Sequence, residues 1–139
     1  MKVILDVNVV LDVLLAREEF RESTELLRAV VEEKIEAFVP LHGLTTIYYF
    51  LRKEMVDKDC RLLLSTLLNV VTVVPISHDD VRIAIDLPIT DFEDAIVSMT
   101  ASILQADYIV TRNIRDFAHS KIRAITPSDF LSLFYTSLQ

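Results

Sequence analysis

Acidic residues stand at three places along the chain, each beside a segment whose pattern indicates a strand end or a helix start. Asp6 directly follows the apolar run Val3-Ile4-Leu5, and Asp94 falls at the start of an apolar helical stretch. Asp116 comes shortly after another apolar, β-branched run. Carboxylate oxygens that converge in one place suit hard divalent cations such as Mg²⁺ or Mn²⁺. The sequence therefore raises the possibility of a metal-dependent reaction, provided that the fold brings the three acids together.

The elements that would position these acids alternate regularly between strands and helices. Apolar and β-branched runs predict strands over residues 2–6, 35–39, 70–74, 108–111 and 122–125. Helical spacing predicts helices over residues 20–33, 44–53, 60–69, 77–86, 90–105 and 127–136. Such alternation predicts an α/β protein, a three-layer α/β/α sandwich with a parallel sheet. Ligands of open α/β sheets bind at the carboxyl ends of the strands, where Asp6 would lie.

The acids near residue 92 also have an ordinary structural explanation. Thr90 and Glu93 have the spacing of a capping box, and Asp91 would suit the positive end of the helix dipole. Asp94 fits this explanation less well, because a carboxylate in the first turn of a buried helix is costly unless it is paired or bound to a cation. On these residues alone, capping and metal binding are evenly balanced for Asp94.

The other acids have similar alternatives. Asp6 could simply begin a turn after its strand, and Asp12 could cap the helix predicted over residues 20–33. Asn113 and Asp116 have a spacing that permits an Asx turn. Each position is weak evidence by itself, and the three acid-bearing ends carry weight only together.

Bulk composition narrows the class of protein. A chain of 139 residues with 52% hydrophobic residues is expected to fold as one domain, residues 1–139. The single Cys60 excludes an internal disulfide and fits a reducing, cytoplasmic compartment, and no apolar run is long enough to span a membrane. The net charge of −7 argues against broad nonspecific nucleic-acid binding, but a nuclease whose acids hold a metal remains compatible with it.

Three segments of the chain resemble the signature blocks of PIN-domain proteins. They are residues 6–12 (DVNVVLD), 91–95 (DFEDA) and 111–117 (TRNIRDF), and they occur in the expected order over nearly the whole chain. The most similar group is the VapC-like ribonuclease toxins of toxin–antitoxin systems. The resemblance implies a five-stranded parallel sheet between helices and metal-dependent cleavage of RNA phosphodiesters. It also implies a cognate antitoxin and a homodimer.

The resemblance further implies roles for individual residues. Asp6, Asp94 and Asp116 match the acids that bind Mg²⁺ or Mn²⁺ and carry catalysis. Supporting positions around the pocket are Asn8, Asp91, Thr111 and Asn113. Arg112 and Arg115 flank the last block and could hold the RNA backbone, although a solvated surface is the commoner role for either one.

One position departs from the family pattern. Thr46 stands where family members often carry a Glu in the helix after the second strand. Asp91 or Asp12 could compensate; otherwise the chain would be a catalytically weakened PIN-like module that binds RNA or protein. The three histidines, His42, His78 and His119, lack the spacing of zinc ligands and are expected on loops or facing solvent, without a catalytic role.

Overall fold

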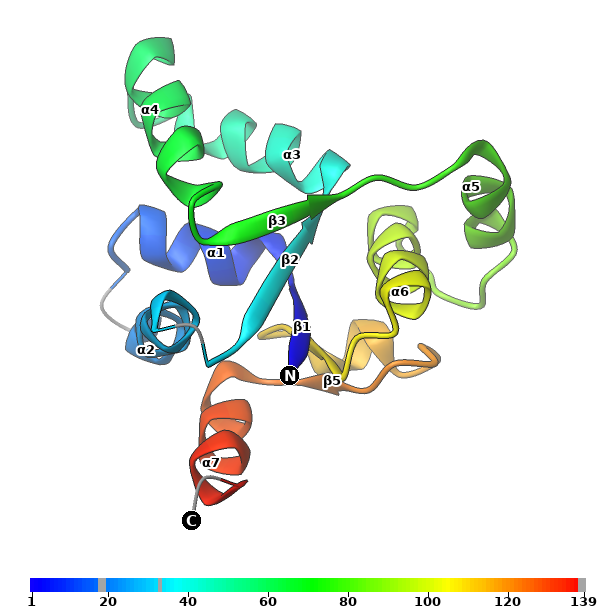
Figure 1. Ribbon diagram of the computed structural model, residues 1–139. Helices are drawn as coiled ribbons and strands as arrows, with labels where there is room; N and C mark the ends of the chain where they lie inside the picture. Colours follow the sequence, from blue (N-terminus) through cyan, green and yellow to red (C-terminus); the bar gives the residue numbers. More distant parts are fainter. Residues whose placement is uncertain (18–19, 33, 138–139) are drawn as a thin grey trace.

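Five strands form one parallel sheet in the computed structural model, which describes residues 1–17, 20–32 and 34–137 (Figure 1). The strands are β1 (Lys2–Leu5), β2 (Glu36–Pro40), β3 (Val71–Val74), β4 (Tyr108–Val110) and β5 (Ala124–Ile125). Their order is β3-β2-β1-β4-β5, and every neighbouring pair is parallel. The predicted α/β class and parallel sheet are confirmed, and all five carboxyl ends lie at one edge.

The central strand β1 is apolar because helices cover both of its faces. Val3, Ile4 and Leu5 are at most 1% exposed. Successive side chains of a strand point to opposite faces, and Val3 and Leu5 accordingly join one buried cluster while Ile4 joins the other. After Lys2 at its start, the strand has no polar position before the chain reaches Asp6.

The helices pack on both faces of the sheet. They are α1 (Val7–Leu14), α2 (Arg21–Val31), α3 (Leu41–Leu51), α4 (Asp57–Leu67), α5 (His78–Ile85), α6 (Phe92–Leu104) and α7 (Pro127–Ser137), with a short 3₁₀ helix, η2 (Ile114–Phe117). In Figure 1, α1 and α2 lie on one side of the sheet, and α6 lies on the other, with α5 beyond it. This arrangement is the predicted three-layer sandwich.

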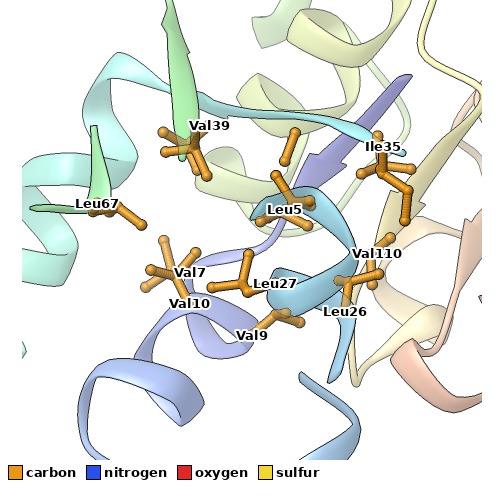
Figure 2. Close-up of a cluster of buried hydrophobic side chains, with 14 of the residues drawn as sticks. Leu5, Val7, Val9, Val10, Leu26, Leu27, Ile35, Val39, Leu67 and Val110 are labelled. Atoms are coloured by element: carbon orange, nitrogen blue, oxygen red, sulfur yellow. The ribbon is translucent and has the colours of Figure 1, made fainter. Parts of the chain in front are cut away.

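The larger core lies between the sheet and the helices α1 and α2 (Figure 2). Side chains from both helices meet those of the strands there, among them Leu5, Val9, Val10, Leu26, Leu27, Val39 and Val110. Burying each aliphatic side chain contributes about 1.5–3 kcal/mol relative to leaving it in water. The packing fixes α1 close to the carboxyl edge of the sheet.

Helix α1 was not among the predicted elements. Its sequence, VNVVLDVL, is rich in β-branched residues that favour helices only weakly. Two contributions overcome this preference: the Asp6 side chain accepts a hydrogen bond from Val7 N, and the apolar face that includes Val9 and Leu11 is fully buried. Asp12 consequently lies inside α1, and the prediction that it caps the next helix is wrong.

Most of the other predicted elements are present with shifted ends. Helices α3 and α4 begin at Leu41 and Asp57, three residues before their predicted starts. Ser77 forms a capping box at the start of α5, and at the start of α7 Thr126 Oγ1 accepts a hydrogen bond from Asp129 N at 3.1 Å. Within the described ranges, no helix combines the length and apolar character that a membrane crossing requires.

Candidate active site

The order of the strands reverses between β1 and β4, and two polar residues follow these strands. β2 and β3 continue the sheet on one side of β1, whereas β4 and β5 lie on the other side. Asp6 and Thr111 come directly after β1 and β4, and Thr111 Oγ1 donates a hydrogen bond to Asp6 Oδ2 at 2.8 Å. Ligand sites of open α/β sheets form at such a switch point.

Both carboxylate oxygens of Asp6 accept hydrogen bonds. Oδ2 accepts from Thr111, and Oδ1 accepts from Val7 N at 2.8 Å. Burial raises the pKa of Asp6, while these two hydrogen bonds oppose the rise. Thr111 is itself held in place, because its Oγ1 accepts a hydrogen bond from Asn113 N at 3.0 Å. The first acid is therefore oriented by the first residue of α1 and by the residue that follows β4.

Asp94 carries the largest electrostatic perturbation among these acids. Asp91 is the N-cap of α6 and accepts a hydrogen bond from Asp94 N at 3.0 Å, so the predicted Thr90–Glu93 capping box is wrong. The pKa of Asp94 is raised to about 7, first by burial and then by the negative charges of nearby acids. Those acids are Asp91, Asp6, Asp116 and Glu93. The structure thus gathers these carboxylates closely enough for their negative charges to repel one another.

We call Asp6, Asp91, Glu93, Asp94 and Asp116 the acid group. An open cleft of about 370 Å³, the acid cleft, exposes part of this group. Asp91, Asp94 and Asp116 line it together with Arg115 and His119. Asp116 belongs to η2 and is exposed, and its backbone N donates to Asn113 O rather than to the Asn113 side chain. The Asx turn considered for these two residues is therefore absent. The cleft combines three carboxylates with one guanidinium.

The chemistry of these donors fits a hard divalent cation. They are carboxylate oxygens whose mutual repulsion a cation would relieve, and Asp6, Asp94 and Asp116 are the residues that would hold it. Across residues 1–17, 20–32 and 34–137, no three acidic, histidine or cysteine side chains are grouped closely enough to hold an ion as they stand. Closing the site around a cation therefore requires side-chain movement.

Arg112 and Asp12 are engaged in a separate ion-pair network. Asp12 is fully buried, and its oxygens lie 3.1 Å from Arg112 Nε and 3.2 Å from Arg17 Nη1. Ser23 Oγ donates a further hydrogen bond to Asp12 at 3.2 Å, and the Arg112 guanidinium stacks on the Phe20 ring. Asp12 is thus paired with cations and is poorly placed to compensate for Thr46. Of the two arginines considered for RNA, only Arg115 lines the acid cleft.

Asn8, Asn113 and Thr46 are the remaining positions that the sequence singled out. Asn8 is exposed in the first turn of α1, and Asn113 is exposed in the segment after β4. Thr46 is half-buried in α3, where its Oγ1 donates a 3.4 Å hydrogen bond to His42 O within the same helix. Thr46 therefore contributes a hydroxyl, and no charge, to its part of the site.

A histidine–glutamate pair beside the acids was not anticipated from the sequence. His42 lies in the first turn of α3, half-buried, with its Nε2 3.7 Å from Glu93 Oε1. Burial lowers the pKa of His42, whereas the charges of Glu93 and Asp6 oppose that shift. The prediction of a loop or solvent-facing position is wrong for His42, while His78 and His119 are exposed. The available signal was its position directly after the second strand, which places it at the same sheet edge as Asp6.

The fold and the site together define a class: a doubly wound α/β protein with carboxylates gathered at its switch point. The chain matches the family model of the PIN domain over residues 2–115, and it belongs to this family. Among curated proteins, none matches the chain in sequence.

Solved structures of similar fold include components of toxin–antitoxin complexes. VapBC2 from Rickettsia felis, bound to a DNA fragment from its promoter, matches with a TM-score of 0.72 and 14% identity, covering 91% of this chain and 98% of that chain. A toxin–antitoxin complex from Klebsiella pneumoniae matches with a TM-score of 0.69 and 23% identity, covering 90% of this chain and 97% of that chain. FitAcB from Neisseria gonorrhoeae matches with a TM-score of 0.69 and 14% identity, covering 91% of this chain and 98% of that chain. At these identities the likeness establishes the fold.

Proposed function

We propose that residues 1–139 form one PIN domain that acts as a metal-dependent endoribonuclease, using Mg²⁺ or Mn²⁺. The observation that carries this proposal is the gathering of acids near the β1/β4 switch point, where burial and the charges of neighbouring acids raise the pKa of Asp94 to about 7. Carboxylates so arranged favour a bound cation, and membership of the PIN family supports a phosphodiester substrate.

The role proposed for each residue of the site follows from its contacts. Asp6, Asp94 and Asp116 hold the metal, which when bound activates water for attack on phosphorus and neutralises charge on the phosphoryl oxygens. Thr111 fixes the orientation of Asp6 through its 2.8 Å hydrogen bond. Arg115, across the cleft from the α6 acids, offers a cation to the RNA backbone. Each side chain thereby has a role that its position permits.

We further propose that the protein is the toxin of a toxin–antitoxin pair and works in the cytoplasm as a homodimer. The solved structure of similar fold from Klebsiella pneumoniae is described as a toxin–antitoxin complex, which supports a protein antitoxin. The net charge of −7 suits a basic partner. Exposed apolar side chains on and beside α3 and α4, among them Tyr49, Val56 and Leu62, offer surface for association.

The direct test is RNA cleavage by the purified protein with Mg²⁺, with Mn²⁺ and with EDTA. Asp6→Asn and Asp94→Asn should each remove metal-dependent cleavage, because both delete a negative charge from the acid group. Asp79→Asn is the matched control, since Asp79 is also an acid in the first turn of a helix but lies exposed on α5. Cleavage that is equal in wild type and both variants, or unaffected by EDTA, would refute the nuclease.

A second candidate, a PIN-like binding module with weakened catalysis, is favoured by Thr46. Position 46 lacks the carboxylate that the family often carries, and Asp12 is paired with Arg17 and Arg112 rather than with the acid group. Calorimetric titration with Mn²⁺ separates the two candidates. Micromolar binding that Asp94→Asn abolishes supports the nuclease, whereas the absence of binding supports the module.

A further inference from the structure

A second cleft, of about 490 Å³, lies along the same sheet edge as the acids. Pro40 and Val74, the last residues of β2 and β3, form its floor, and side chains of α3, α5 and α6 form its walls. The wall residues are mostly apolar: Leu41, Val81, Phe92 and Ile96, with His42 and Thr45 from the first turns of α3. The acid group occupies the ends of β1 and β4, so the cleft is the neighbouring site along the edge.

The first turn of α6 separates the two clefts. Asp91 and Asp94 line the acid cleft, whereas Phe92 and Glu93, between them in sequence, line the apolar cleft. The charge of Glu93 also raises the pKa of both Asp6 and Asp94, which shows how near it lies to them. A ligand held at the acids therefore needs to extend past only one helical turn to enter the apolar cleft.

The lining selects an uncharged, flat ligand with a polar edge. Phe92 and Leu41 are 53% and 56% exposed, so their apolar surfaces are available for stacking. His42 Nε2 is buried and has no hydrogen-bond partner in the part of the chain that the structure describes, and Glu93 Oε1 lies 3.7 Å from it, beyond hydrogen-bond distance. An unsatisfied buried polar atom on a binding wall calls for a partner. No lysine or arginine belongs to the described lining, and Glu93 repels anions, so a phosphate is a poor occupant.

We propose that the apolar cleft binds the unpaired base of a nucleotide adjacent to the phosphate held at the acids, and so sets the sequence preference of cleavage. This inference rests on the proposed nuclease function. A nucleobase has apolar faces that stack on aromatic side chains and an edge that hydrogen-bonds, which matches Phe92 and His42. The base remains neutral, so it is tolerated beside Glu93.

The first experiment uses ribonucleosides, which lack phosphate and therefore report on the cleft without a metal. In a methyl NMR titration of the full chain with each of the four ribonucleosides, shifts should be confined to the lining, including Val81 and Ile96. Phe92→Ala should weaken this binding about 5- to 150-fold, the range measured for loss of one base-stacking aromatic. Tyr135→Ala is the matched control, because Tyr135 is a comparably exposed aromatic on α7.

The second experiment measures the bases at the cleavage junctions of a random-sequence RNA pool. Wild type should show a base bias at one position beside the cut, and Phe92→Ala and Thr45→Trp, which fills the cleft from its exposed rim, should flatten it while metal-dependent cleavage persists. An unchanged bias in both variants would overturn the proposal.

The two experiments distinguish a failure of the proposed nuclease function from a failure of the proposed base site. If wild type cleaves no RNA, the nuclease is refuted, and the nucleoside titration alone decides the cleft: Phe92-dependent binding supports a base site. If no nucleoside shifts the lining, the base site is overturned.

Discussion

Thr111 donates a 2.8 Å hydrogen bond to the carboxylate of Asp6, joining the ends of two neighbouring strands. Thr111 is fully buried, and its hydroxyl also accepts a hydrogen bond from Asn113 N. One hydroxyl thus orients the first acid and the segment that leads to Asp116. A residue in this position governs the acid group without a charge of its own.

Thr111→Val tests this role, because valine keeps the shape of threonine and removes only the hydroxyl. We expect Mn²⁺ affinity and cleavage rate to fall about 10- to 100-fold, the usual effect of deleting a group that orients a ligand. Thr111→Ser restores the hydroxyl and should recover most of the loss. Calorimetry of Mn²⁺ binding is the measurement, and unchanged affinity in the valine variant would show that Asp6 needs no such support.

The raised pKa of Asp94 predicts a dependence of stability on pH. Its pKa in the folded protein is about 7, above the ordinary value of 3.8, so between these values the folded state holds a proton that the unfolded state releases. The free energy of unfolding of the metal-free protein should therefore decrease as pH rises through this window. Asp94 is partly exposed, which limits the size of the effect.

Thermal unfolding at about pH 5 and about pH 8 measures this dependence. The Tm of wild type should fall by roughly 2–5 °C more than that of Asp94→Asn, which cannot titrate at this position. Comparing the two proteins cancels the opposite contribution of His42, whose pKa is lowered. Added Mn²⁺ should raise the Tm of wild type most at the higher pH. Parallel pH profiles in both proteins would contradict the assignment.

The buried Asp12 should matter for stability more than for chemistry. Asp12→Asn leaves Arg17 and Arg112 without their counter-charge, and we expect a loss of about 2–4 kcal/mol in the free energy of unfolding. The control is Glu32→Gln, which breaks the exposed Glu32–Lys34 pair and should cost less than about 0.5 kcal/mol. Urea denaturation gives both values, and equal losses in the two variants would refute the role of the buried network.

Thr46→Glu should tighten metal binding. Residues four apart share one helix face, and side chains of a helix lean toward its N-terminus, so a glutamate at 46 would reach back over the turn that holds His42. We expect Mn²⁺ affinity to rise several-fold and metal-free stability to fall, because another carboxylate joins the acid group. Thr46→Gln has the same length without the charge and should leave the affinity unchanged. An equal gain in both variants would exclude charge as the cause.

The strands of the sheet could be predicted from the sequence, whereas the helix that follows Asp6 could not. Apolar runs such as residues 3–5 identify strands because burial on both faces leaves little other choice. Helix α1 escaped prediction because its β-branched residues favour strands, and packing against the rest of the core, together with the Asp6 cap, makes them helical. Tertiary burial is invisible in a short window of sequence.

Some residues of the site could likewise be predicted from the sequence, while the contacts between distant residues could not. Asp6 and Asp94 could be proposed because they interrupt apolar segments, where a charge needs a reason. The His42–Glu93 pair could not, since its members lie 51 positions apart and meet only through the packing of α3 beside α6. The internal pairing of Arg112 with Asp12 was equally hidden, because an arginine after a strand looks the same whether it binds RNA or a buried acid.

The hydrogen bond between Asp6 and Thr111 also constrains when the acid group can assemble during synthesis. The two residues are 105 positions apart, as are Lys2 and Asp107, whose backbone and side chain are joined at the other end of the same strand pair. On a ribosome, β1 emerges long before β4, and such distant contacts form late. A nascent chain therefore carries its first acid for most of translation without the partner that orients it, which would keep a nuclease inactive beside the RNA that encodes it.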